Sequence, residues 1–234
     1  MTPLKVFSAL ILTCAIAGTP CAFADSITVY TTGVNHSGVV LGAGVQDTHY
    51  ALTTTGCTPV ATCANYESTT TTTDPSTWAP NTTTANWINP GPPGNKSGNT
   101  NYPSGADYIY TQTFDLAGFY SSTAELKGSW TSDNNSEILL NGVLQSFGVG
   151  FPGYTPGSIV SFDLTSGFQS GENTLEFIVQ NGANNGYPNP NPTGLFVNKL
   201  SLTASPVPEP SSLLLLGTGL LGACGVLRRR FVRS

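Results

Sequence analysis

Hydrophobic and polar residues alternate in short runs along the middle of the chain, where a helical period is nearly absent. The runs that predict strands lie at 27–30, 108–114, 124–130, 137–144, 159–164, 174–180 and 195–204. Within the run 124–130, Leu126 and Trp130 share one face, while Glu125 and Lys127 share the other. This pattern is typical of a half-buried antiparallel strand, so we expect Trp130 to lie in the core.

Turn residues separate these runs. The run 137–144 contains Asn141-Gly142, a dipeptide that supplies the two positive φ angles of a tight hairpin turn. The other runs are separated by clusters of Gly, Pro and Asn. Several short strands with such turns predict an all-β fold, namely an antiparallel β-sandwich or jelly roll.

The C-terminal region has a different pattern. Pro208-Glu209-Pro210 precedes an apolar run that ends at Leu227, and Arg228-Arg229-Arg230 follows it. A helix over 211–227 would be about 26 Å long, close to the roughly 30 Å of a bilayer core. The arginines are expected to stay cytoplasmic by the positive-inside rule, which leaves the residues before Pro208 outside. We therefore predict a transmembrane helix at 211–227 and a basic tail at 228–234.

This arrangement resembles the PEP-CTERM sorting signal. The residues that carry the resemblance are Val207, Pro208, Glu209, Pro210, Arg228, Arg229 and Arg230. The resemblance implies that an exosortase in the membrane recognises the segment, cuts near the Pro-Glu-Pro triplet and passes the protein to the cell surface. The alternative is a plain single-span anchor that is never cut.

The N-terminal region predicts a secretory signal peptide. Lys5 precedes the apolar stretch 6–17, and Ala22-Phe23-Ala24 forms an A-x-A cleavage site. Pro20 before Cys21 does not fit a lipoprotein signal. We expect Sec-dependent export and cleavage after Ala24. The chain then divides into a signal peptide (1–24), an ectodomain (25–205) and a sorting and anchor segment (206–234).

The ectodomain is acidic and has almost no bases. It contains twelve Asp and Glu residues and three lysines, a formal balance of −9, and no arginine. Such a surface repels nucleic acid and anionic lipid, which excludes a nucleic-acid-binding protein. Its two cysteines, Cys57 and Cys63, predict a local disulfide because the exported protein meets an oxidising compartment. A redox or metal pair is the alternative, but the five-residue gap fits no C-x-x-C pattern.

The residues from Tyr108 onwards resemble galactose-binding-like β-sandwich domains. The resemblance is carried by the order Asp133-Asn134, Leu140-Asn141-Gly142, Phe162-Asp163-Leu164 and Gly171-Glu172-Asn173-Thr174-Leu175. It covers about 100 residues well and 25–103 only loosely. It implies that function lies in loops at one end of the sandwich, often with aromatic side chains that stack on sugar rings.

Aromatic residues near Pro, Asn or Gly are the candidates for such stacking. The ligand-binding candidates are Tyr187, Trp78, Trp87 and Tyr154, with Tyr102 and Phe151 as further members of the group. Tyr187 is the best exposed candidate, whereas Trp87 could equally be a buried anchor for the N-terminal half.

A second candidate site is a turn rich in oxygen ligands. Asp133, Asn135 and Glu137 offer the hard oxygen atoms that calcium prefers, and related sandwiches sometimes hold a structural calcium. The favoured interpretation is nevertheless an Asx turn that leads into the strand at Glu137.

Catalytic motifs are absent from the sequence. His36 and His49 fit no zinc pattern, and no G-x-S-x-G occurs. A glycosidase with two carboxylates from loops and strands, such as Asp47, Asp107 and Glu176, stays open as an alternative. The threonine run 69–73 predicts a solvent-facing strand or an O-glycosylated loop; an ice-binding array is disfavoured because consecutive threonines face opposite ways.

The sequence therefore predicts a non-enzymatic exported protein. We expect it first as an inner-membrane-anchored intermediate and then at the cell surface or in the extracellular matrix. Its predicted role is to bind carbohydrate or exopolysaccharide. The alternative is a structural or adhesion protein of the biofilm matrix without defined sugar affinity.

Overall fold

The computed structural model describes residues 27–56, 69–70, 77–91, 94, 102–150, 153–182, 192–207, 217–222, 225 and 228. The chain divides into two units. Ala24–Val207 form one unit, and the terminal segments Met1–Phe23 and Pro208–Ser234 form the other.

In the terminal unit, residues 217–222 are helical and exposed. They lie inside the helix predicted at 211–227, most of whose other residues fall outside the described part of the chain. Among the residues that the structure describes, no helix has the length and apolar character needed to cross a membrane.

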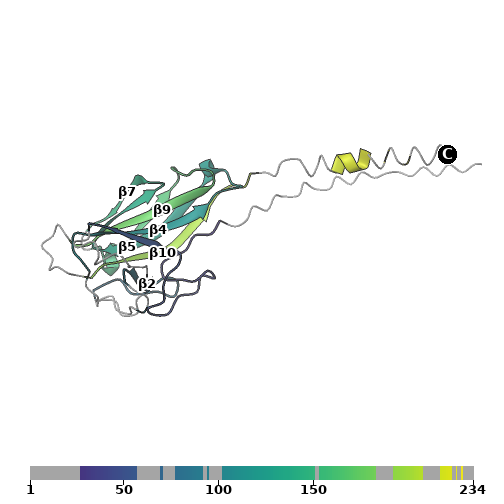
Figure 1. The fold of residues 1–234 in the computed structure, drawn as a ribbon. Coiled ribbons are helices and arrows are strands. Elements are labelled where there is room, and N and C mark those ends of the chain that lie inside the picture. The colour runs from purple at the N-terminus through teal and green to yellow at the C-terminus, as the bar shows by residue number, and fades with distance from the viewer. Residues whose placement is uncertain are drawn as a thin grey trace, which may run out of the picture. The chain divides into compact units, whose positions relative to one another are not determined.

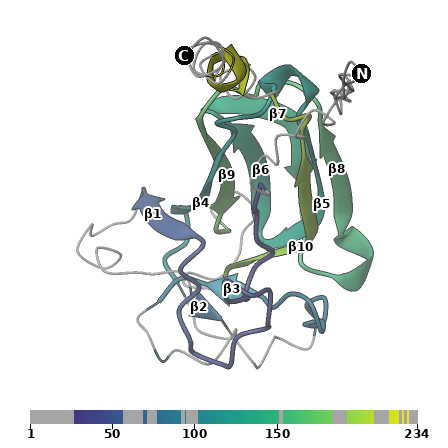
Figure 2. The same cartoon turned by 90° about the vertical axis from the view of Figure 1, so that its right-hand side faces the viewer.

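The unit Ala24–Val207 contains two five-stranded sheets, and every pairing between its described strands is antiparallel. The first sheet has the order β1 (Ala51–Thr55), β4 (Asp107–Asp115), β9 (Glu172–Gln180), β6 (Asn135–Leu140) and β7 (Val143–Val149). The second has the order β2 (Thr69–Thr70), β3 (Ile88–Asn89), β10 (Gly194–Thr203), β5 (Glu125–Asp133) and β8 (Val160–Leu164). Two short 3-10 helices, η2 (Ser121–Thr123) and η3 (Pro156–Ser158), lie in the connections. Figures 1 and 2 show the two layers, so the predicted β-sandwich is confirmed.

Most of the predicted strands are present. The runs at 108–114, 124–130, 159–164, 174–180 and 195–204 correspond to β4, β5, β8, β9 and β10. The run 137–144 is the β6–β7 hairpin, whose turn residues Asn141 and Gly142 have φ angles of 53° and 74°.

The strand predicted at 27–30 is wrong. The Tyr30 N–H donates to Gln112 Oε1 (2.7 Å), and Gln112 Nε2 donates to the Tyr30 carbonyl (2.9 Å). At Tyr30 a side-chain amide therefore satisfies the backbone N–H and carbonyl that a neighbouring strand would otherwise pair. No sequence pattern predicted β1 or β3. Two residues of the threonine run, Thr69 and Thr70, form β2; whether the run faces solvent or is O-glycosylated stays a prediction.

The main core lies between the sheets, and Phe177 on β9 is near its centre. Its ring lies 5.4 Å from Trp130 and 6.3 Å from Phe162, measured between centroids. On β5, Leu126 and Trp130 are buried while Lys127 is exposed. The predicted core position of Trp130 is confirmed.

A second, smaller core covers part of the outer face of the second sheet. Because side chains alternate along a strand, Leu195 and Val197 of β10 enter the main core, and Phe196 points to the opposite face. The Trp87 ring packs against those of Phe196 and Trp78, with centroid separations of 5.6 Å and 4.3 Å. The segment 77–91, which precedes β4, thus shields the sheet face that would otherwise be open.

A β-bulge follows Phe196, the residue of β10 that the second core covers. Asn198 pairs with Ser129 and Ser201 pairs with Lys127, so Lys199 and Leu200 together oppose Gly128. Lys199 has a φ of 54° and is exposed, while Leu200 packs against the main core. The bulge therefore places an extra cationic side chain on the outer face.

The last described residues of the sandwich are tied to the loop before η2. Tyr120 N donates to the Ser205 carbonyl (2.9 Å), and Val207 N donates to the Gly118 carbonyl (2.8 Å). Ser205 N also donates to Thr123 Oγ1 (2.8 Å). The chain is thus hydrogen-bonded into the fold as far as Val207.

Candidate functional site

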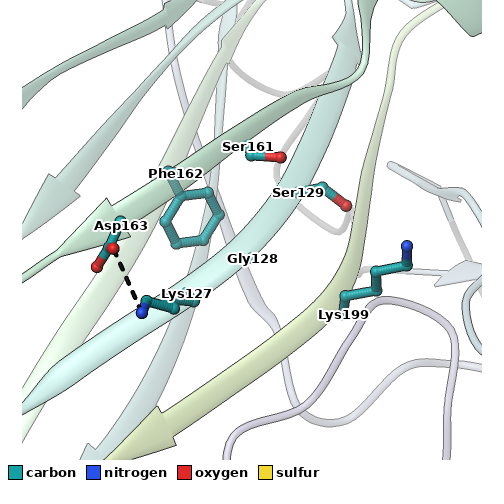
Figure 3. Close-up of a pocket in the computed structure, with 7 residues that line it drawn as sticks. All are labelled: Lys127, Gly128, Ser129, Ser161, Phe162, Asp163 and Lys199. Atoms are coloured by element: carbon teal, nitrogen blue, oxygen red, sulfur yellow. Dashed lines mark ion pairs between the residues drawn. The ribbon is translucent and has the colours of Figure 1, made fainter.

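A groove of about 500 Å³ crosses the uncovered part of the second sheet. It is lined by residues of β5, β8 and the bulge of β10, namely Lys127, Gly128, Ser129, Ser161, Phe162, Asp163 and Lys199. The register sets their arrangement: Lys127 lies opposite Asp163, and Ser129 lies opposite Ser161. Figure 3 shows the two serines on adjacent strands, with the Lys127–Asp163 pair on one side and Lys199 on the other.

The missing side chain at Gly128 is part of this geometry. A Cβ atom there would come within 2.8 Å of the Phe162 ring and 3.0 Å of Leu200 Cδ1. These distances are shorter than carbon atoms tolerate, so only glycine lets the Phe162 ring pack across β5.

The charges in the groove are unevenly satisfied. Lys127 Nζ lies 2.7 Å from Glu125 Oε1 and 3.5 Å from Asp163 Oδ2. The hydrogen bond to Glu125, followed by the negative charge of Asp163, raises the pKa of the Lys127 ammonium. Lys199 makes no ion pair with any residue that the structure describes. Two of the three lysines of the acidic ectodomain thus line one groove, and Lys199 has no counter-charge among the described residues.

This groove was not predicted from the sequence. Phe162 and Asp163 belong to a segment that carries the family resemblance, but the groove residues come together only through the β5–β8 register and the β10 bulge. The available signal was the alternation in 124–130, which already placed Lys127 on the outward face.

The prediction that Trp78 and Trp87 are exposed ligand-stacking residues is wrong. Trp78 is 5% exposed and Trp87 0%, because both rings form the second core. Their indole N–H groups are satisfied internally: Trp78 Nε1 donates to Asp133 Oδ2 (3.0 Å) and Trp87 Nε1 donates to the Ala79 carbonyl (2.6 Å). The buried-anchor alternative for Trp87 is the correct one, and Tyr102 is buried as well.

The other aromatic candidates are less constrained. Tyr154 is half-buried and packs against the second core, and its carbonyl accepts a hydrogen bond from Ala79 N (2.7 Å). Tyr187 and Phe151 lie outside the described residues. A sugar-stacking role for Tyr187 or Tyr154 stays a prediction.

The expected calcium ligands lie where β5 passes into β6. Asp133 is 5% exposed, and its carboxyl accepts hydrogen bonds from Trp78 Nε1 at 3.0 Å and from Asn134 Nδ2 at 2.6 Å. Burial raises the pKa of Asp133 from 3.8 to about 7, although the hydrogen bond from Trp78 acts in the opposite direction. Glu137 is exposed on β6.

Unpaired oxygen atoms lie next to this carboxyl in the sequence. The side-chain oxygens of Asn134 and Asn135 are buried and have no hydrogen-bond partner among the residues that the structure describes. In the described part of the chain, no three His, Cys, Asp or Glu side chains are grouped to hold a metal ion. Calcium at Asp133, Asn135 and Glu137 therefore stays a prediction.

Several predicted positions fall outside the described residues. These are the disulfide Cys57–Cys63, the cleavage residues Ala22 and Ala24, and the sorting residues Pro208, Glu209, Pro210, Arg229 and Arg230. The two described sorting residues, Val207 and Arg228, are both exposed.

Comparison with known proteins identifies the C-terminal segment. Residues 206–230 match the PEP-CTERM protein-sorting motif. No curated protein matches the chain. Among solved structures, the chain is similar to a family 35 carbohydrate binding module from an environmental isolate. The alignment covers 47% of this chain and 77% of the module, with 8% sequence identity and a TM-score of 0.27.

The sequence and the fold together define an exported β-sandwich protein. More particularly, the chain carries a PEP-CTERM sorting motif, which marks it for export and for processing by an exosortase at the membrane. The predicted resemblance of the C-terminal segment is thereby confirmed.

Proposed function

We propose that the protein is a non-catalytic glycan-binding protein of the cell surface or extracellular matrix, and that it binds sugar in the groove across β5, β8 and β10. The observation that carries the proposal is the set of polar groups on the groove. Lys199 and Lys127 supply donors, Asp163 supplies acceptors, and Ser129 and Ser161 supply hydroxyls that can do either.

The shape and size of the groove support this ligand class. Its volume of about 500 Å³ lies within the roughly 300–1,000 Å³ typical of small-molecule sites. Sugar rings carry hydroxyls at regular positions. Alternate residues on adjacent strands also present their polar groups at regular positions, which the strand geometry fixes. The site is therefore preorganised on strands.

Binding is favoured over hydrolysis by the state of the carboxylates. A glycosidase uses two carboxyl groups on opposite sides of the scissile bond, one of them in surroundings that keep it protonated. Here Glu125 and Asp163 contact the same Lys127 ammonium, and both side chains are substantially exposed. Such carboxylates suit hydrogen bonding to sugar hydroxyls better than proton donation.

The test is a glycan array probed with protein purified after export of the full-length chain. Lys199→Asn removes the uncompensated charge with a residue that tolerates positive φ, and Ser161→Tyr fills the groove from the edge strand. Losing a hydrogen bond to a charged group costs about 1.5–3 kcal/mol, so we expect Lys199→Asn to weaken binding about tenfold to a hundredfold.

Lys96→Asn is the matched control because it makes the same change of net charge elsewhere in the chain. Retention of full affinity by Lys199→Asn and Ser161→Tyr would refute the groove as the site. A blank array from folded protein would refute glycan binding itself.

The second candidate function is a structural or adhesion role in the matrix. It is favoured by Val143 and Leu144, which are exposed apolar side chains at the start of the β7 edge strand. Exposed apolar residues on an edge strand favour association between chains. Concentration-dependent self-association together with a blank array would support this function.

A further inference from the structure

The only two histidines of the chain meet in the structure, although they lie in separate turns of the N-terminal region. His49 Nε2 lies 2.9 Å from His36 Nδ1. The two rings are perpendicular, with their centroids 4.6 Å apart. His36 is exposed, whereas the side chain of His49 is only 4% exposed. One fixed imidazole and one accessible imidazole thus face each other at the surface.

Asp47 fixes the orientation of His49. Its Oδ1 lies 3.1 Å from His49 Nδ1 and accepts from the His49 backbone N–H at 3.0 Å. Its Oδ2 accepts from Gly33 N at 2.7 Å, and the carboxylate is completely buried. A carboxylate in this position holds the His49 proton on Nδ1 and leaves the Nε2 lone pair directed towards His36.

The face of the His49 ring also packs against an aromatic ring. The Tyr30 ring stacks on His49 with 3.6 Å between centroids and an interplanar angle of 18°. The Tyr30 carbonyl is itself held by Tyr50 Oη at 2.7 Å. His49 is therefore positioned by a hydrogen bond at Nδ1 and by stacking, while its Nε2 faces only His36 Nδ1 among the described residues.

This arrangement has the features of a metal-binding imidazole. Histidine ligands usually donate their second ring N–H to a carboxylate, which fixes the tautomer and raises the basicity of the ligating nitrogen. Two nitrogens that bind one metal at about 2.0–2.1 Å, with an angle of about 90–109°, lie about 2.9–3.3 Å apart. The observed 2.9 Å separation falls in this range.

We propose that His36 and His49 bind a divalent transition-metal ion, Cu²⁺, Ni²⁺ or Zn²⁺, through His49 Nε2 and His36 Nδ1. Imidazole nitrogen suits these ions, whereas the oxygen-rich turn at Asp133 suits calcium. The ion replaces the proton that the two nitrogens share, and neutral His36 carries its proton on Nε2 instead. No net proton is released by the neutral pair.

The ligand count sets the character of the site. No third His, Cys, Asp or Glu joins the pair in the part of the chain that the structure describes, so water completes the coordination. The bound ion is consequently exchangeable and differs from a four-ligand structural zinc. Asp47 is a positioning residue that acts through His49.

The test measures Cu²⁺ binding by titration calorimetry and by electron paramagnetic resonance, with protein purified after export of the full-length chain. We expect one equivalent of Cu²⁺ with nitrogen hyperfine structure from two imidazoles, and thermal stabilisation of the protein by the ion. His36→Ala changes an exposed side chain; it should keep the metal-free melting temperature and lose the calorimetric signal. Asp47→Asn should bind about 10–100-fold more weakly, provided that its near-ultraviolet circular dichroism matches the wild type.

Unchanged Cu²⁺ affinity in folded His36→Ala, or a spectrum without imidazole nitrogen, would overturn the proposal. Absence of any Cu²⁺, Ni²⁺ or Zn²⁺ binding to the wild type would overturn it equally. Neither result depends on whether the groove binds a glycan.

Discussion

The carboxyl group of Asp133 makes the stability of the sandwich depend on pH in an unusual direction. Asp133 lies at the end of β5 and is 5% exposed, and its carboxyl accepts hydrogen bonds from Trp78 Nε1 and Asn134 Nδ2. No cationic group pairs with it in the described part of the chain. The perturbation is a rise in pH from 5 to 8 in the presence of a chelator, for the wild type and for Asp133→Asn.

The sign follows from the proton balance. The pKa of Asp133 rises from 3.8 to about 7 in the fold because of burial. Between these values the folded protein keeps a proton that the unfolded chain has lost, so the free energy of unfolding falls as the pH rises. At about 1.4 kcal/mol per pH unit, the whole window is worth about 4 kcal/mol, and the span from pH 5 to 7 about 3 kcal/mol. Above pH 7 this dependence ends.

Asp133→Asn should remove this contribution. An asparagine oxygen can still accept from Trp78, and its amide can donate to the unpaired Asn134 oxygen once the Asn134 amide is turned over. Urea unfolding at pH 5, 6, 7 and 8, followed by tryptophan fluorescence, measures the difference between the two proteins. We expect the wild type to lose about 3 kcal/mol more than the variant across this range.

Asp115→Asn is the control because it removes an exposed carboxyl at the end of β4. This variant should keep the loss of about 3 kcal/mol between pH 5 and pH 8 that the buried Asp133 gives the wild type. Parallel pH profiles for the wild type and Asp133→Asn would refute the reasoning, since the carboxyl would then carry no proton specific to the fold.

Three further changes test other parts of the structure. Gly128→Ala should lower the free energy of unfolding by about 1–3 kcal/mol, because its Cβ would overlap the Phe162 ring; unchanged urea unfolding would contradict this packing. Asn173→Ala removes the donors to the Gln169 and Gly171 carbonyls and a buried acceptor, so we expect a loss of about 2–3 kcal/mol and a lower melting temperature. Millimolar calcium at pH 8 should raise the melting temperature of the wild type but not of Asp133→Asn, and equal behaviour of the two would argue against calcium at this turn.

Strands that bury one face could be predicted from the sequence. In β4, β5 and β9 one set of alternate residues enters the core, and this requirement is visible as a period of two. In β1 no residue is fully buried, so its sequence Ala-Leu-Thr-Thr-Thr contains no such period. The false strand at 27–30 had the right alternation, but the backbone N–H and carbonyl of Tyr30 are paired by the side chain of Gln112, which no local pattern records.

The packing on the outer face of the second sheet was not predicted from the sequence. Trp78 and Trp87 lie among Pro, Asn and Thr residues, which are typical of exposed loops. They are buried because Phe196 points outward from β10, a fact that depends on long-range packing. The groove and the histidine pair depend in the same way on register and on loop closure, so residue types alone did not reveal them.

The hydrogen bonds that hold Ser205 and Val207 have a consequence for maturation. A peptidase binds its substrate in an extended form. The peptide bonds from Ser205 to Val207 cannot adopt this form until the hydrogen bonds to Gly118, Tyr120 and Thr123 break. Cleavage there would follow the population of the opened form, as it does for other locally unfolding segments. Cleavage beyond Pro208 would be independent of that population. For a cut before Pro208, the rate of maturation would therefore depend on folding. Cleavage would be slow in a completed sandwich and fast in one whose last strand had not yet docked.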